Sequence, residues 1–294
     1  MRTLIACTAL LLLPLSALAA DAPNCKFSAP RSLSLDTAGI SKVVVEVNQH
    51  TLKVAASGTG GKLDGRACAS SEDVLKDLVL DQRRSGNTLL VSLRRDGKQG
   101  NWSVGSNYAW LDIRGSLPAN LPLQLKVGSG DAEIENAQSL DLAVGSGDAH
   151  ARRVRGALVA TVGSGDIDID GAGSLDLASV GSGDLKARGI GGNVRIGSVG
   201  SGDVEISNVR GNLRLETLGS GDVDFRDVSG NVDVGTVGSG EVKLGSIGGS
   251  VDVRSHSSGD IIVNGAGSLT VGHSGSGDVQ HSGVRGAVNL PRRR

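Results

Sequence analysis

The feature that most constrains the fold of this chain is a four-residue phrase, Gly-Ser-Gly-Asp, which recurs from residue 128 onward. The nine copies include one in which glutamate replaces the aspartate and one in which Ser-Ser-Gly replaces Gly-Ser-Gly. Their acidic residues are Asp131, Asp148, Asp166, Asp184, Asp203, Asp222, Glu241, Asp260 and Asp278. Successive acidic residues are separated by 17, 18, 18, 19, 19, 19, 19 and 18 positions, so the phrase marks a structural period rather than a flexible linker.

The apolar residues between the phrases predict what each period forms. Counted from each acidic residue, they fall at positions +1, +3, +6, +10 and +12, as at Val204, Ile206, Leu213 and Leu215, and one more precedes the next phrase. Alternation over such short runs predicts strands with one buried face rather than helices. A lone strand pair cannot bury that face, so the coils must stack about 4.8 Å apart. We expect an all-β fold, a parallel single-stranded β-helix (β-solenoid) of about nine coils of 17–19 residues over residues 127–290.

Glycine is frequent at both expected corners of each coil. One corner is the phrase itself, and a second is marked by Gly-Asn at 192–193, 211–212 and 230–231. Tight corners often need backbone with positive φ, which glycine adopts without strain. We therefore interpret the glycines of the phrase as positions of positive φ.

The two ends of the chain carry different signals. Residues 1–20 combine Arg2, an apolar run over 4–15 and an exit of small residues, a pattern that predicts a secretory signal peptide. That run is too short to span a bilayer and no later segment is long enough, so we expect no transmembrane segment. Residues 291–294, Pro291 and three arginines, form a basic tail that discourages strand addition. The protein is expected to be exported to the periplasm, the cell surface or the medium.

Residues 21–126 lack the phrase and are expected to form a β-rich N-terminal cap with irregular early coils. Strand patterns occur over 42–47, 51–55, 78–83, 88–94, 108–114 and 123–127, and a short helix is expected to start at Ser70 or Ser71. A cap is needed because the first coil would otherwise expose its core and its unpaired backbone. Cys25 and Cys68 remain after signal removal, and in an oxidising compartment we expect them to form a disulfide.

These features together resemble a known family. The signal peptide, the β-rich lead-in ending in Leu121-Pro122-Leu123 and the tandem coils over 127–278 look like the bacterial putative-adhesin family of β-strand-repeat proteins, whose function is unknown. They are also similar, more distantly, to the GIN head domain of putative autotransporter adhesins. The resemblance implies the solenoid architecture and an adhesin-like role, and it supplies no catalytic motif to transfer.

The nine acidic residues should stack as a ladder of carboxylates, which is a candidate contact for ions or ligands. Neighbouring carboxylates about 4.8 Å apart repel by roughly 1 kcal/mol even at the dielectric constant of water. Hydrogen bonds from backbone N–H groups, or hydration, are the structural explanation of how this repulsion is offset. Calcium between coils is the alternative, but calcium needs several converging oxygens and one phrase per coil supplies few. We expect a structural ladder and no cofactor.

Hydroxyl groups should form two further columns. The serines of the phrases share one register, and a second contains Thr161, Ser179, Ser198, Thr217, Thr236 and Ser255. Such a double rank could bind a glycan. Serine is also ordinary in tight turns, and we expect these hydroxyls mainly to solvate the corner.

The sequence favours a binding or structural role over catalysis. Without the signal peptide the chain has 29 basic residues (the 30 of the full chain less Arg2) and 31 acidic ones, a balance that gives no reason to expect nucleic-acid binding. His256, His273 and His281 stand at different registers, so no metal site is expected. We expect a non-catalytic adhesin or envelope protein that recognises a surface glycan or another envelope component through many weak contacts. The alternative is a carbohydrate-active β-helix enzyme, although coils of constant length leave no long loops for a cleft.

Overall fold

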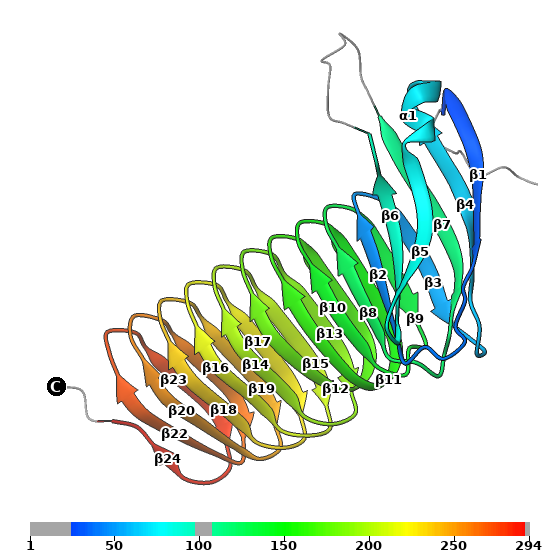
Figure 1. Cartoon of the computed structure of the whole chain (residues 1–294). Coiled ribbons are helices and arrows are strands. Elements are labelled where there is room, and N and C mark those ends of the chain that lie inside the picture. The colour runs from blue at the N-terminus through cyan, green and yellow to red at the C-terminus, as the bar shows by residue number, and fades with distance from the viewer. Residues whose placement is uncertain (1–24, 98–107, 292–294) are drawn as a thin grey trace, which may run out of the picture.

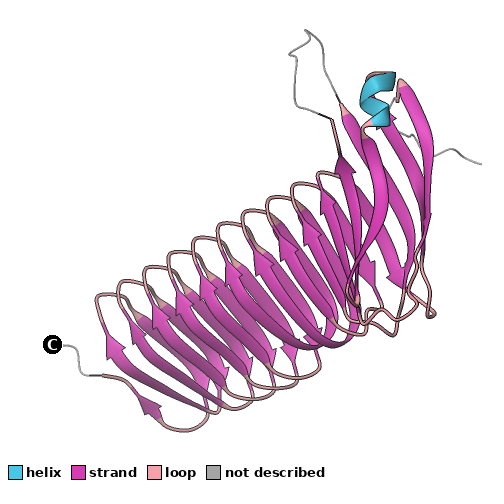
Figure 2. Ribbon diagram, in the orientation of Figure 1, coloured by secondary structure: helices cyan, strands magenta, loops and turns pink. Residues whose placement is uncertain are grey.

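The computed structural model describes residues 25–97 and 108–291, and within them the protein is a long stack of β-coils that ends in a small layered cap (Figure 1). The predicted signal peptide and the three terminal arginines lie outside the described residues. Strands make up almost all of the regular structure, and one short helix lies in the cap (Figure 2).

The repeat region is the predicted parallel β-solenoid of about nine turns. Most turns supply two strands, whereas β11 and β12 each run through a whole turn as one strand. The strands pair in parallel with the equivalent strands one turn earlier and one turn later: β13 lies between β12 and β15, and β14 between β12 and β16. The strands are β8 Leu123–Val127, β9 Asp131–Glu135, β10 Leu140–Val144, β11 Asp148–Val162, β12 Asp166–Val180, β13 Leu185–Ile190, β14 Val194–Val199, β15 Val204–Val209, β16 Leu213–Leu218, β17 Val223–Val228, β18 Val232–Val237, β19 Val242–Ile247, β20 Ser250–His256, β21 Ile261–Ala266, β22 Ser268–Ser274, β23 Val279–Val284 and β24 Val288–Asn289.

A further tier precedes the first Gly-Ser-Gly-Asp phrase. It consists of β2 (Lys42–Asn48) and β3 (Thr51–Ala56), which pair in parallel with β8 and β9. In this tier the backbone of Asn48 and His50 takes the place of the phrase, since the N–H groups of Ser129 and Gly130 donate to Asn48 O at 2.8 Å. The chain then leaves the stack and returns to it at β8.

The excursion between β3 and β8, together with the first strand of the chain, forms the cap. Its elements are β1 (Phe27–Ser34), β4 (Lys62–Ala69), α1 (Glu72–Lys76), β5 (Leu78–Ser85), β6 (Thr88–Arg95) and β7 (Ala109–Leu117). Strands β6 and β7 pair in parallel with β2 and β3, and each continues into antiparallel neighbours, β5 on one side and β4 with β1 on the other. Both strands of the first tier thereby find a hydrogen-bonding partner in the cap, so the strand edges at this end of the stack are paired.

Two features of the cap were predicted from the sequence, the start of its helix and its disulfide. Ser71 is the N-cap of α1, and its hydroxyl accepts a hydrogen bond from the N–H of Val74 (3.3 Å), as predicted. The predicted disulfide joins Cys25 to Cys68, with Cα atoms 5.6 Å apart. It ties the residues before β1 to β4.

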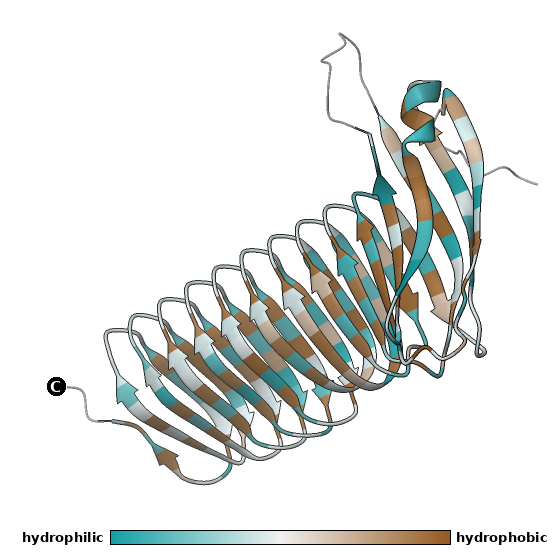
Figure 3. Ribbon diagram, viewed as in Figure 1, coloured by the Kyte–Doolittle hydropathy of each residue, from teal (hydrophilic) through white to brown (hydrophobic). Residues whose placement is uncertain are grey.

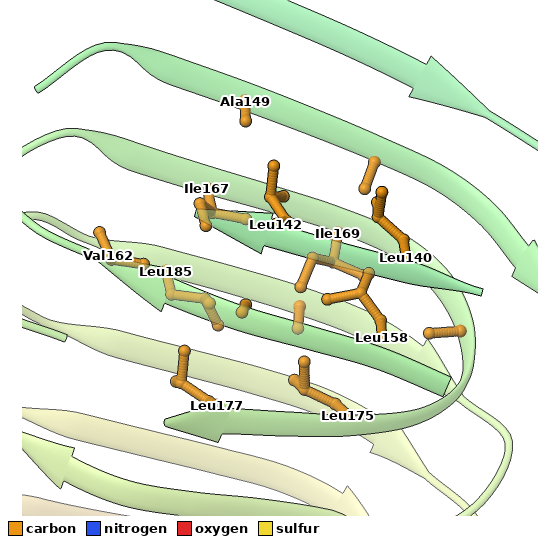
Figure 4. Close-up of a cluster of buried hydrophobic side chains, with 14 of the residues drawn as sticks. Leu140, Leu142, Ala149, Leu158, Val162, Ile167, Ile169, Leu175, Leu177 and Leu185 are labelled. Carbon is orange, nitrogen blue, oxygen red and sulfur yellow. The ribbon is translucent and has the colours of Figure 1, made fainter. Parts of the chain in front are cut away.

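The core is a set of aliphatic columns that run the length of the rod (Figure 3). Leu140, Leu158 and Leu175 stack in one column, because each occupies the same register as the next (Figure 4). A neighbouring column contains Phe225, which is fully buried between its register partners. The burial predicted from the alternating pattern is confirmed, because each added tier buries its apolar residues against the same positions of the tier before it.

Glycine is required in the phrase for a different reason from the one expected. None of them has positive φ. The glycine before each acidic residue is instead required by close approach: a Cβ added at Gly183 would lie 1.8 Å from the carbonyl oxygen of Gly165. The interpretation in terms of positive φ was therefore wrong for the phrase.

Positive φ occurs elsewhere, five residues after every acidic position. There the first strand of each tier bends, and the values run from 53° to 91°. The residues are Asn136, Arg153, Gly171, Gly189, Asn208, Asp227, Ser246, Gly265 and Gly283. We call this bend the left-handed corner.

Candidate functional site

The acidic residues of the phrases form a hydrogen-bonded ladder on the surface of the rod. The N–H of Asp184 donates to Oδ1 of Asp166 (3.0 Å), and Asp203 repeats this contact with Asp184 (3.0 Å). Equivalent bonds run from Asp148 to Glu241 and again from Asp260 to Asp278, with distances of 2.8–3.4 Å. Six carboxylates accept such a charge-assisted bond from the next tier, which offsets the repulsion along the column: Asp148, Asp166, Asp184, Asp203, Asp222 and Asp260.

Glu241 interrupts this ladder. Its longer side chain hydrogen-bonds to Nζ of Lys243 at 2.6 Å, and this contact raises the pKa of Lys243. Among the described residues, no hydrogen bond joins the N–H of Asp260 to Glu241. The one extra methylene of glutamate thus removes one rung of the ladder.

A second ladder runs along the other corner, at the Gly-Asn positions. The N–H of Asn212 donates to Oδ1 of Asn193, Asn231 to Asn212, and Ser250 to Asn231, all at 2.9 Å. Sequence reasoning identified this corner but missed the ladder. The signal was present in asparagine at a constant period, since a short amide side chain can accept a backbone N–H of the neighbouring tier.

The hydroxyl columns lie where the sequence places them. Thr161, Ser179, Ser198, Thr217, Thr236 and Ser255 are successive register partners. All nine phrase serines are exposed, and one hydrogen bond links two of them, Ser276 to Ser258 at 3.4 Å. Together with the acidic ladder they form a polar edge, defined as the Ser and the Asp or Glu of the nine phrases.

Charged residues on the flat faces pair across tiers. Arg188 donates to Oδ2 of Asp170 (3.1 Å), which lowers the pKa of that carboxyl, and Arg195 contacts Glu216 (2.7 Å). These pairs are exposed, so they add little to stability. No group of three or more His, Cys, Asp or Glu in residues 25–97 and 108–291 is placed to hold a metal ion.

Two histidines, His50 and His256, are core residues. His50 is 1% exposed, its Nδ1 accepts the N–H of Leu111 (3.3 Å), and burial lowers its pKa to about 4. His256 replaces the apolar residue of its column and is held by Gly259 O (2.9 Å) and Ser274 Oγ (2.6 Å). The spacing of the repeat places His256 at the buried position before its phrase, whereas no spacing predicted the burial of His50.

The exterior of the rod is hollowed at the left-handed corner. A groove of about 710 Å³ runs across five tiers there, and we call it the corner groove. Its lining is Arg153, Val154, Arg155, Gly171, Ala172, Gly173, Gly189, Gly191, Asn208, Val209, Arg210, Asp227 and Ser229. A second cavity of about 860 Å³ continues it toward the cap and shares Arg155.

The sequence matches one family model. Residues 123–248 match the model described as "Putative auto-transporter adhesin, head GIN domain". Among curated proteins, none matches the chain. No helix in the described part of the chain has the length and apolar character that crossing a membrane requires.

Several solved structures match the chain at low sequence identity. A putative lipid-binding protein from Parabacteroides distasonis is 17% identical, with 86% of this chain and 96% of that chain covered and a TM-score of 0.47. A putative adhesin from Parabacteroides merdae is 9% identical (87% and 96% covered, TM-score 0.39), and one from Bacteroides fragilis is 17% identical (87% and 98% covered, TM-score 0.33). Over residues 123–248 the chain is thus similar to the GIN head domain of putative auto-transporter adhesins, the domain that the repeats resemble.

Proposed function

We propose that this protein is an exported, non-catalytic adhesin that recognises a repetitive surface polymer through many weak contacts. The observation that carries the proposal is the polar edge, in which serine and carboxylate groups repeat in one register along nine turns. A partner with its own repeat can meet such a row at many points, so contacts that are weak individually add up through effective concentration. The adhesin-like domain over 123–248 supports the same role.

The carboxylate ladder is proposed to be structural and to work without a cofactor. Six of the nine carboxylates already accept a backbone N–H of the next tier, which supports a ladder that needs no metal ion to offset its stacked charges. We expect the melting temperature of the mature protein to be the same in calcium and in excess chelator. A fall of several degrees in chelator would show that calcium belongs to the fold.

The second candidate is a carbohydrate-active enzyme on a β-helix. Glycoside hydrolysis needs two carboxyls facing each other across the sugar at a set separation. The carboxyls of this rod stand instead in columns along its surface, bonded to backbone or to arginine. This arrangement favours binding over catalysis.

One experiment separates the two functions. The mature protein is tested for retention on a glycan array and on whole bacterial and host cells, beside a screen for polysaccharide depolymerisation. We expect retention without turnover. Turnover without retention would refute the adhesin proposal, as would the absence of retention on every surface.

A further inference from the structure

We propose that the corner groove is the binding face for an anionic linear polysaccharide, whose acidic groups pair with Arg155 and Arg210. The inference rests on the proposed function and adds the face and the class of glycan. The glycan would bind at the corner groove, where the otherwise regular surface of the rod is hollowed.

The groove exists because two consecutive tiers lack side chains at the left-handed corner. Gly171 and Gly173 occupy one tier, and Gly189 and Gly191 the next. The backbone itself and buried Ala172 therefore form the floor. Such a floor suits the flat C–H face of a sugar ring, which needs close approach to apolar surface.

Arginines stand at both ends of this bare floor. Arg155 and Arg210 occupy equivalent positions three tiers apart, which corresponds to about 14 Å along the rod. Arg155 uses Nη2 to donate to Ala119 O (2.7 Å), and a guanidinium has further N–H donors to offer. Arg210 makes no side-chain hydrogen bond or ion pair within residues 25–97 and 108–291.

The remaining charges define where an anion can sit. Arg153 is already engaged by Glu135 and by Oδ1 of Asn136 (2.9 Å), so it contributes little free charge. Asp227 closes the groove at its C-terminal end. The two uncompensated cations are therefore Arg155 and Arg210, and the planar guanidinium binds a carboxylate through two parallel bonds.

The continuation toward the cap favours a polymer over a small anion. Beyond Arg155 the second cavity is lined by Asn120, Gln138 and Ser139, whose amides and hydroxyl match the donors and acceptors of sugar hydroxyls. A glycan chain lying along the corner would contact both cavities at once. Its length would run parallel to the axis of the rod.

The test uses the mature chain and two kinds of groove variant. Arg210→Gln removes a cation, and Gly191→Gln places a side chain on the floor, where the added Cβ has its nearest neighbour at 3.7 Å and no positive φ is required. The matched controls lie on other faces: Arg214→Gln makes the same charge change, and Gly245→Gln adds the same side chain with its nearest neighbour at 3.6 Å. Melting temperatures confirm that all four variants fold.

Binding is measured by calorimetry with polygalacturonate, alginate and chondroitin sulfate, with neutral pullulan for comparison. We expect at least one acidic polymer to bind roughly tenfold or more tighter than pullulan, because only an acidic polymer can form charge-assisted pairs with Arg155 and Arg210. Both groove variants should weaken that binding by about tenfold, and both controls by less than about twofold.

Four outcomes would overturn the inference. Equal binding of acidic and neutral polymers would remove the role of charge, and tighter binding of a single-stranded oligonucleotide would assign the groove to another class of polymer. Cell-surface retention that the groove variants leave unchanged would move the contact to another face while the adhesin function stands. If the unmutated mature protein were retained neither on cells nor on any polymer, the proposed function would be refuted as well.

Discussion

The glycine before each acidic residue offers the sharpest test of how closely the tiers approach. In Gly183→Ala the new Cβ would lie 1.8 Å from Gly165 O, so the two tiers must separate by more than about 1 Å to reach an ordinary contact. That separation stretches three hydrogen bonds at the same corner, donated by the N–H groups of Gly181, Ser182 and Gly183 at 2.9–3.2 Å. At about 1 kcal/mol for each bond, the variant should lose about 3 kcal/mol of unfolding free energy.

The control for this prediction is Gly245→Ala. Its Cβ meets only Arg226 Cγ at 3.6 Å, and its φ is not positive, so alanine should raise stability by about 0.4–1 kcal/mol through the unfolded chain. Urea unfolding of both variants, followed by circular dichroism, measures the difference. Similar stabilities for the two variants would refute the close-approach explanation of the phrase.

Three further predictions concern the ladder, the buried histidine and the disulfide. Glu241→Asp should restore the missing rung and raise stability by about 0.5–1 kcal/mol in urea unfolding, and a loss of stability would contradict the ladder. His50 has its pKa lowered from 6.5 to about 4, so the unfolded chain binds the proton first, and stability should fall as pH drops from 6.5 toward 4, by up to about 3 kcal/mol. His50→Gln should flatten that slope, and an unchanged slope would show that other groups cause it. Replacing Cys25 and Cys68, 43 residues apart, by serine should cost about 4 kcal/mol on the chain-entropy model, and an unchanged denaturation midpoint would contradict this.

The sequence predicts the solenoid well because every tier repeats the same physical problem. Val204 and Ile206 face inward for the same reason as their counterparts one tier away, so one period is enough to derive the whole column. The pairing of Cys25 with Cys68 and the cap of α1 at Ser71 also follow from local chemistry.

What the sequence does not predict lies where the repeat is broken. Strands β1 and β4 were not predicted, and they are held by pairing with each other and, for β4, with β7. The corner groove depends on glycine in two tiers at a bend whose positive φ has no fixed residue type, since Arg153 and Asn208 occupy it as well. The burial of His50 likewise depends on β7, which enters from far along the chain.

The account depends on identical positions stacking at a constant step along the rod, and distances between spin labels test this most directly. Labels at Ser146→Cys and Ser239→Cys, five tiers apart, should be about 24 Å from each other, and labels at Ser146→Cys and Ser276→Cys, seven tiers apart, about 34 Å. The account predicts that the distance grows by about 10 Å between the two pairs. Distances that do not increase with the number of tiers would contradict the stacked rod and the multivalent binding that relies on it.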